Sequence, residues 1–145
     1  MLRTSSALWL VRQSRDASTA IVIESSSQLA MARSPLALPI SAATADLEIG
    51  FLVYCAGADP DFAPFLSQPV GAAEAMVRRN CLVPVQLCHH FAAPMAQRGR
   101  GAVVLFGSGA GLAGGPNMVA YGASKAFDMV FAEALWAELN GQGVD

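Results

Sequence analysis

Tyr121 and Lys125 are the two residues in this sequence best suited to catalysis. They lie four residues apart in the segment Tyr121-Gly-Ala-Ser-Lys125, and this spacing places both side chains on one face of a helix. A tyrosine with its ordinary pKa of ~10 is a poor acid–base catalyst at neutral pH, but a nearby ammonium favours the phenolate and lowers that pKa. A tyrosine tuned in this way can pass a proton to or from an alcohol oxygen.

The use of basic residues supports this interpretation. Lys125 is the only lysine in the chain, which also contains eight arginines. If arginine serves wherever a positive charge suffices, the one lysine marks a place where a compact ammonium is needed. The residues alone leave an alternative open, a surface lysine near a half-buried tyrosine, because this spacing is common in helices.

Four elements are expected to position the pair. Phe51–Cys55 and Ala102–Phe106 are short, continuous apolar runs with a glycine one or two residues beyond their ends, which predicts buried parallel strands. Segments Glu74–Arg98 and Val119–Leu139 have helical periodicity, and Pro84 lies inside the first. The order β-α-β-α predicts an α/β fold with a parallel sheet covered by helices. The predicted apolar faces are Met76, Val83, Leu87 and Phe91 in the first helix, and Phe127, Val130, Phe131, Ala134 and Leu135 in the second.

Composition limits the class of protein. At 145 residues the chain is long enough for one domain and too short for two. A hydrophobic fraction of 54% implies that much apolar surface is buried or shared with a partner. A net charge of −2 gives no reason to expect nucleic acid or a membrane as partner, and no apolar run is long enough to span a bilayer. Three cysteines without a CxxC pair fit a reducing cytoplasm.

Two motifs invite interpretations that the context does not support. Gly109-Ala-Gly111-Leu-Ala-Gly114 matches a dinucleotide-binding fingerprint, but Gly-Pro-Asn follows it where a helix should begin. We expect these glycines to form a loop at the end of a strand. Cys88 with His89 and His90 could suggest a metal, but adjacent helical residues diverge and no four-ligand pattern is present, so no metal site is predicted.

From about Ala42 to Asp145 the chain resembles the short-chain dehydrogenase/reductases, a resemblance covering about seven-tenths of the sequence. Tyr121-x-x-x-Lys125 looks like the catalytic pair of that family. Ser108, thirteen residues before Tyr121, and Asn80, twenty-eight before Ser108, match its catalytic serine and fourth catalytic residue. Cys55, Ala56 and Gly57 look like its Asn-Ala-Gly segment beside the cofactor.

The resemblance implies a Rossmann-like α/β/α fold and a mechanism. Tyr121 would be the general acid in carbonyl reduction and the base in alcohol oxidation. Lys125 would lower the pKa of Tyr121 and bind the nicotinamide ribose, and Ser108 would hold the substrate oxygen. The Asn80 carbonyl loses its helical donor to Pro84 and would hold a water that serves as a proton relay; the alternative is an Asn that merely solvates a kink.

The implied cofactor is NAD or NADP, bound near Cys55, Ala56 and Gly57 as well as near Tyr121 and Lys125. The substrate would be a small-molecule secondary alcohol or ketone, of apolar character given Phe62, Phe65 and Leu112 nearby. In this family the two long helices pack against a second subunit, which implies a homo-oligomer.

The sequence departs from the family in three places. Cys55 replaces the usual Asn, which removes an amide able to tie neighbouring strands together. No glycine precedes Gly50, so the family's glycine-rich phosphate turn is missing, and the chain stops where the family starts another strand. We therefore expect residues 42–145 to form a partial, incomplete catalytic domain. Residues 1–41 form an atypical segment, disordered or alien, whose first fifteen residues, with three arginines, weakly resemble a transit peptide.

Two hypotheses follow. The first is a nicotinamide-dependent oxidoreductase. The second is a truncated, non-catalytic remnant that acts, if at all, through association of its helices. For the chain by itself we expect cofactor binding to be weak or absent, because the phosphate turn is missing.

Overall fold

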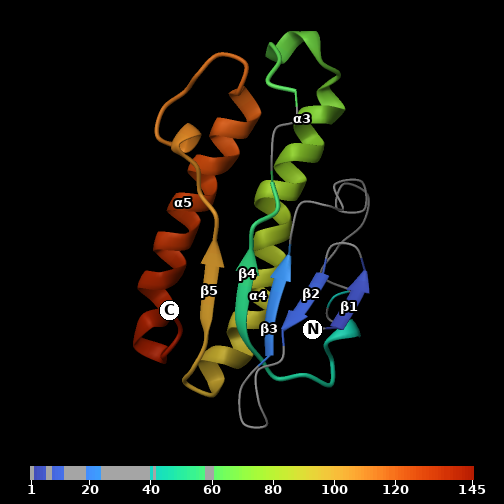
Figure 1. Ribbon diagram of the computed structural model, residues 1–145. Coiled ribbons are helices and arrows are strands. Elements are labelled where there is room, and N and C mark those ends of the chain that lie inside the picture. The colour runs from blue at the N-terminus through green and yellow to red at the C-terminus, as the bar shows by residue number, and fades with distance from the viewer. Residues whose placement is uncertain (1, 6–7, 12–18, 24–39, 41, 58–60) are drawn as a thin grey trace.

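A computed structural model of the chain describes residues 2–5, 8–11, 19–23, 40, 42–57 and 61–145, with the backbone alone described for the first two segments (Figure 1). Its centre is a five-stranded sheet in which β3, β4 and β5 are parallel and β1 and β2 are antiparallel. The carboxyl ends of the three parallel strands lie at the same edge (Figure 1). In sheet order the strands are β1 (Leu2–Ser5), β2 (Leu8–Val11), β3 (Thr19–Ile23), β4 (Ile49–Tyr54) and β5 (Ala102–Leu105).

The helices confirm the predicted β-α-β-α order. Between β4 and β5 the chain forms α3 (Val70–Val77), the π-helical segment η3 (Arg78–Leu82) and α4 (Val83–Gln97), which together correspond to the first predicted helix. After β5 comes α5 (Val119–Leu139), with the bounds that the sequence predicts. Short 3-10 turns complete the path: η2 (Phe65–Ser67), η4 (Gly109–Gly111) and η5 (Asn140–Gln142).

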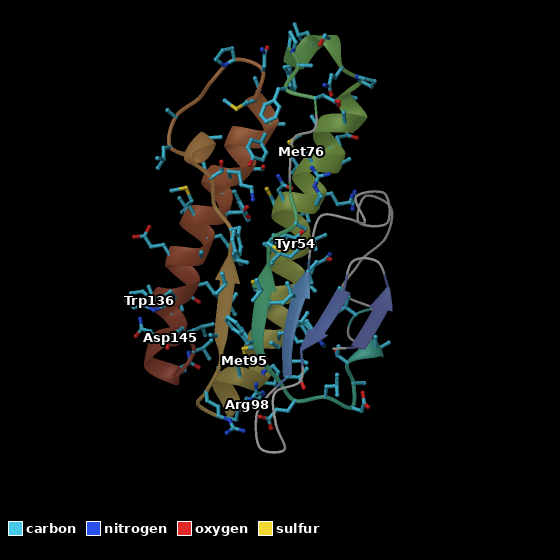
Figure 2. All side chains as sticks on the ribbon, viewed as in Figure 1. Tyr54, Met76, Met95, Arg98, Trp136 and Asp145 are labelled. Carbon is cyan, nitrogen blue, oxygen red and sulfur yellow. The ribbon has the colours of Figure 1, made fainter. Side chains whose placement is uncertain are left out.

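The core forms between one face of the sheet and α4. Leu52 on β4 and Ile21 on β3 are fully buried there, because alternate residues of a strand point to the same face. Figure 2 shows Tyr54 and Met95 toward opposite ends of this core. On the other face Phe51 and Val104 remain 38% and 37% exposed. The sheet is thus well covered on one side only by the described residues, as the prediction of an incomplete α/β fold implies. The α4 residues of the core are Val83, Leu87, Cys88, Phe91 and Met95.

The buried face of α5 differs from the prediction. Val130 is 67% exposed, Phe127 is 36% exposed and Ala134 is exposed, although all three belong to the predicted apolar face. Phe131 and Leu135 do pack against the core. The prediction was wrong by part of a turn, because small and polar residues occupy the buried side of the first half of α5. These residues are Gly122, Ser124, Lys125 and Asp128.

The first forty residues contribute more to the sheet than their pattern indicates. Two strands are predicted from the sequence, whereas β3 pairs with β4 in parallel and β1 and β2 extend the sheet to five. Ile21 and Ile23 on β3 are buried in the core. The division of the chain between residues 41 and 42 stays a prediction.

The end of the chain also reaches the sheet. Val144 forms a parallel bridge with Gly101, and the N–H of Val103 donates to the Asp145 carbonyl at 2.7 Å. Strand pairing therefore begins where the sequence resemblance places another strand. Within the described part of the chain, no helix combines the length and apolar character needed to cross a membrane.

Candidate active site

Lys125 is buried beside the carboxyl end of β5. Its Nζ donates to the carbonyl of Phe106 at 2.7 Å and to Oδ2 of Asp128 at 3.0 Å. The side chains of Lys125 and Asp128 are only 4% and 3% exposed. The ammonium is therefore tied both to the residue that follows β5 and to the next turn of α5.

Tyr121 lies one turn before Lys125 on the same helix and is half-buried. The ring of Phe62 stands edge-on to the Tyr121 ring, with 6.4 Å between centroids and an interplanar angle of 73°. Phe62 has φ of +44°, a left-handed backbone conformation that is uncommon for an aromatic residue. The loop after β4 thus covers one side of the predicted catalytic phenol.

Ser108 caps the short 3-10 turn η4 that follows β5. Its Oγ accepts a hydrogen bond from the Ala110 N–H at 3.2 Å. Because an accepting hydroxyl keeps its own hydrogen available, Ser108 can still donate to a ligand oxygen. The side chain is half-buried, as a residue at the rim of a site would be.

Two glycines allow the η4 turn to lie directly on α5. A Cβ placed on Gly111 would come within 2.7 Å of the Ala126 nitrogen and of the Lys125 carbonyl carbon. A Cβ on Gly122 would come within 2.8 Å of the Ala110 oxygen. Backbone meets backbone at both places, so Ser108 is fixed next to the turns of α5 that carry Tyr121 and Lys125.

We expect Gly111→Ala to destabilise the chain by about 1–3 kcal/mol, because the backbone atoms that its methyl group meets cannot move aside individually. Urea unfolding monitored by tryptophan fluorescence measures this change. Gly109→Ala is the matched control, since nothing lies within 4 Å of a Cβ at Gly109. Equal losses in the two variants would contradict the close packing of η4 on α5.

Asn80 joins the two helices through its side chain. Its Nδ2 donates to Ser124 Oγ at 2.8 Å, and Ser124 in turn donates to the Tyr121 carbonyl at 2.8 Å. Its Oδ1 accepts from Arg79 Nε at 3.2 Å. Asn80 is fully buried, so its amide connects α5 to η3 and supports the turn that begins with Tyr121.

The helix around Asn80 is irregular, as Pro84 requires. The N–H of Val83 donates to the Arg78 carbonyl, five residues back, which is the bonding of a π-helix. The Tyr54 hydroxyl donates to the Arg79 carbonyl at 2.6 Å, and burial raises the pKa of Tyr54. The predicted use of the Asn80 carbonyl as a water site stays a prediction.

The predicted cofactor segment follows β4. Cys55 is tied to β3, since its N–H and its thiol both donate to the Ile23 carbonyl, at 3.0 and 3.2 Å. The sequence predicts that replacing Asn by Cys55 removes a link between neighbouring strands. The thiol of Cys55 provides such a link to β3. Ala56 is buried, and Gly57 has φ of +124° with Asn80 Oδ1 only 2.6 Å from where its Cβ would be. Only glycine suits this position.

The structure brings the predicted residues to one edge of the sheet. Ser108 and the Lys125 ammonium lie at the end of β5, Tyr121 is on the first turn of α5, and Asn80 reaches the same helix through Ser124. Three contacts were not predicted: the Asp128 ion pair, the Phe106 carbonyl and the Ser124 link. The i, i+3 spacing of Lys125 and Asp128 was the one signal for them in the sequence.

The glycine motif forms a turn and a loop, as the sequence predicts. Gly109–Gly111 forms the 3-10 turn η4, and a loop continues to α5, so no helix opens at the glycine motif. Cys88 is buried, and burial raises its pKa to about 12, while His89 and His90 are exposed. The thiol is thus protonated at neutral pH and does not share a site with the imidazoles.

Known proteins resemble the chain in sequence. A profile of the family described as short chain dehydrogenase matches residues 17–145, a range that includes β3. Over 106 residues the chain is 35% identical to a 7beta-hydroxysteroid dehydrogenase of Collinsella aerofaciens, a match covering 73% of this chain and 40% of that relative.

Solved structures agree with the sequence match. The bulky-bulky ketone specific alcohol dehydrogenase from Comamonas testosteroni gives a TM-score of 0.72 at 30% identity, over 79% of this chain and 46% of that chain. A short-chain dehydrogenase from Sphingobium yanoikuyae in complex with NADPH gives a TM-score of 0.72 at 29% identity, over 79% and 45%. The chain spans less than half of each relative, and the family match covers most of the chain: it belongs to the short-chain dehydrogenase family.

Proposed function

We propose that this chain forms the catalytic part of an NAD(P)-dependent oxidoreductase that interconverts a bulky, apolar ketone and its secondary alcohol. The observation that supports the proposal is the position of η4, the turn that Ser108 caps, against the helix that carries Tyr121 and Lys125. Close packing of η4 on α5 fixes the serine against the helix that carries the other two. Residues 42–145 supply all of these groups.

The proposed roles follow from the donors each residue has. Ser108 uses its hydroxyl hydrogen to hold the substrate oxygen, since its Oγ already accepts from Ala110. Tyr121 gives a proton to that oxygen in the reductive direction and takes one in the oxidative direction. Lys125 supplies positive charge beside the phenol, from a position that excludes water on most sides. Asn80 supports Tyr121 through Ser124, and its carbonyl is the proposed site of a relay water.

The residues at the ends of β4 and β5 fit a nicotinamide cofactor. Cys55, Ala56 and Gly57 have small side chains or none, and Ala56 is buried, so a flat ligand would approach the strand along its backbone. An ammonium has three donors, and two of those on Lys125 bond to Phe106 and Asp128, which leaves one for a ribose hydroxyl. When bound, the nicotinamide supplies or accepts the hydride. A relative in complex with NADPH supports this class of cofactor.

The surface around Tyr121 favours an apolar substrate. Phe62 is 54% exposed beside the phenol, and Leu112, in the loop after η4, is 75% exposed. Phe65 and Leu66 in η2 are 48% and 93% exposed. Large exposed apolar groups near a polar centre suit a ligand with a bulky hydrocarbon body. Two relatives, a hydroxysteroid dehydrogenase and a bulky-bulky ketone specific alcohol dehydrogenase, support the same class.

We further propose that two copies associate through α3–α4 and α5. Val77 and Leu82 are 44% and 47% exposed, and Val130 and Trp136 on α5 are 67% and 54% exposed. Figure 2 shows Trp136 on the outer side of α5. Apolar residues in these numbers on neighbouring helices favour burial against another subunit.

The three cysteines are free thiols, which supports a cytoplasmic location.

A cofactor titration tests the proposal. NADH and NADPH are added to the purified chain while nicotinamide fluorescence is followed, and reduction of a bulky aryl ketone is then measured by loss of that signal. Saturable binding and turnover support the enzyme. If neither cofactor binds at millimolar concentration, the proposal that this chain is an active oxidoreductase is contradicted. That result would support the alternative, a non-catalytic remnant, and would agree with the weak or absent binding expected from the missing phosphate turn.

A further inference from the structure

We propose that Asp128 is a positioning residue that keeps the Lys125 ammonium charged and fixed at the carboxyl end of β5. The inference rests on the proposed function, because Asp128 would affect the reaction only by positioning Lys125. It adds a residue that the family resemblance did not supply, three positions beyond Lys125 on α5.

The geometry joins three groups at one point. Asp128 Oδ2 lies 3.0 Å from Lys125 Nζ, and the Phe106 carbonyl lies 2.7 Å from the same nitrogen. Phe106 is two residues before Ser108 in the chain. The ammonium is therefore held between a carboxylate on the helix and the backbone that leads to the proposed substrate serine.

Because Lys125 is buried, its ammonium needs the Asp128 carboxylate in order to stay charged. The Lys125 side chain is 4% exposed, and a buried ammonium without a partner releases its proton or leaves the interior. The second carboxylate oxygen of Asp128, Oδ1, is also buried and has no hydrogen-bond partner among the described residues. The carboxylate is thus aimed at Lys125 through one oxygen, and this contact alone offsets its own burial.

Within the part of the chain that the structure describes, Lys125 is the counter-charge of Asp128. The charge of Asp128 is felt by Tyr54 on β4, Cys81 on η3 and Cys88 on α4, where it raises each pKa. Burial raises the pKa of each of these three groups, so all are neutral at pH 7. Burial also raises the pKa of Asp128, and the hydrogen bond and charge of Lys125 oppose that rise.

The single lysine makes the inference directly testable. Acylation by acetic anhydride consumes neutral amines, and the α-amine of the chain serves as the internal reference in peptide mass spectrometry. We expect Asp128→Asn to raise the acylation rate of Lys125 at least about tenfold, because the buried ammonium loses its counter-ion and releases its proton more readily. An unchanged rate would overturn the proposal.

Two controls separate positioning from general loosening of the core. Glu133→Gln removes an exposed carboxylate from the same helix and should leave the rate unchanged. Tyr54→Phe removes the hydrogen bond to Arg79 in the same core without touching Lys125, and it should raise the rate less than Asp128→Asn does. If Tyr54→Phe matches Asp128→Asn, loosening explains both and the proposal fails.

A measurement on the wild-type chain covers the case in which Asp128→Asn does not fold. With ¹⁵N-lysine and ¹³C-aspartate labels, the one ammonium signal should move in step with the Asp128 carboxyl carbon as acid protonates it. Independent titrations of the two signals would overturn the pairing. Neither experiment requires cofactor, so failure of NADPH binding and failure of the positioning role are distinguishable.

Discussion

Tyr121→Phe is expected to lower the rate of ketone reduction by about 10²–10⁴-fold, the usual contribution of a general acid–base group. The phenyl ring keeps the edge contact with Phe62 and removes only the hydroxyl that delivers the proton. Single-turnover rates with NADPH in excess measure the loss, and cofactor affinity from fluorescence should stay within about twofold, because the ring is retained.

The chain contains its own control for this prediction. Tyr54 is the only other tyrosine, and its hydroxyl donates to the Arg79 carbonyl in the core. Tyr54→Phe should lower stability by about 1–3 kcal/mol, because a buried acceptor loses its donor, while the reduction rate changes little. A Tyr121→Phe variant that reduces ketone at the wild-type rate would remove Tyr121 from the mechanism.

Lys125→Met is expected to cost about 3–5 kcal/mol of folding stability at neutral pH, because it leaves Asp128 buried without a counter-charge. Both side chains of the pair are almost completely buried, so water cannot replace the ammonium. Arg100→Met is the matched control, since Arg100 and Glu48 form an ion pair at 2.7 Å with side chains 63% and 50% exposed. Its loss should cost less than about 1 kcal/mol.

The pH dependence of the Lys125→Met penalty has a defined sign. Burial raises the pKa of Asp128, so the folded state prefers the protonated acid, and stability is lost as pH rises through that pKa. The penalty should therefore be largest near about pH 8 and shrink as pH falls toward about 5. Urea unfolding at both pH values measures it. Adding Asp128→Leu should restore most of the stability at pH 8, and a penalty that grows with acid would contradict the ion pair.

The parts of the fold that could be predicted are those with strong local signals. The apolar runs that became β4 and β5 end near glycines, and α5 has the predicted bounds because its helical periodicity is long. β3 was not predicted as part of the sheet, because a five-residue strand in a segment without sustained periodicity carries little information.

The wrong face of α5 has a more specific cause. Hydrophobic periodicity assumes that buried positions are apolar, but the side of α5 toward η4 and η3 carries Gly122, Ser124, Lys125 and Asp128. Each is buried for a reason other than hydrophobicity: close backbone approach, the link to Asn80, or the ion pair. Hydrophobic periodicity therefore assigned Val130 to the predicted apolar face, although Val130 is exposed in the structure.

The candidate site was predictable as a set of positions and not as a set of contacts. The spacing of Ser108, Tyr121 and Lys125 could be read along the chain, and the structure places them at one edge of the sheet. The hydrogen bond from Asn80 to Ser124 joins residues 44 positions apart on different helices, and no local pattern encodes it. Their chemical roles stay predictions that the experiments above test.

The parallel register of β3, β4 and β5 has a consequence for how the chain folds. Phe51 pairs with Ala102, 51 residues later (102 − 51), and Ala20 pairs with Phe51, 31 residues later (51 − 20). Parallel strands cannot pair progressively from a tight turn. The connecting segments must therefore close, at an entropic cost, before any hydrogen bond between the strands stabilises them. Formation of α3–α4 between β4 and β5 shortens the distance that the chain must search. Until that closure, β4 and β5 present unpaired apolar strands to other nascent chains, and this interval is when aggregation competes with folding.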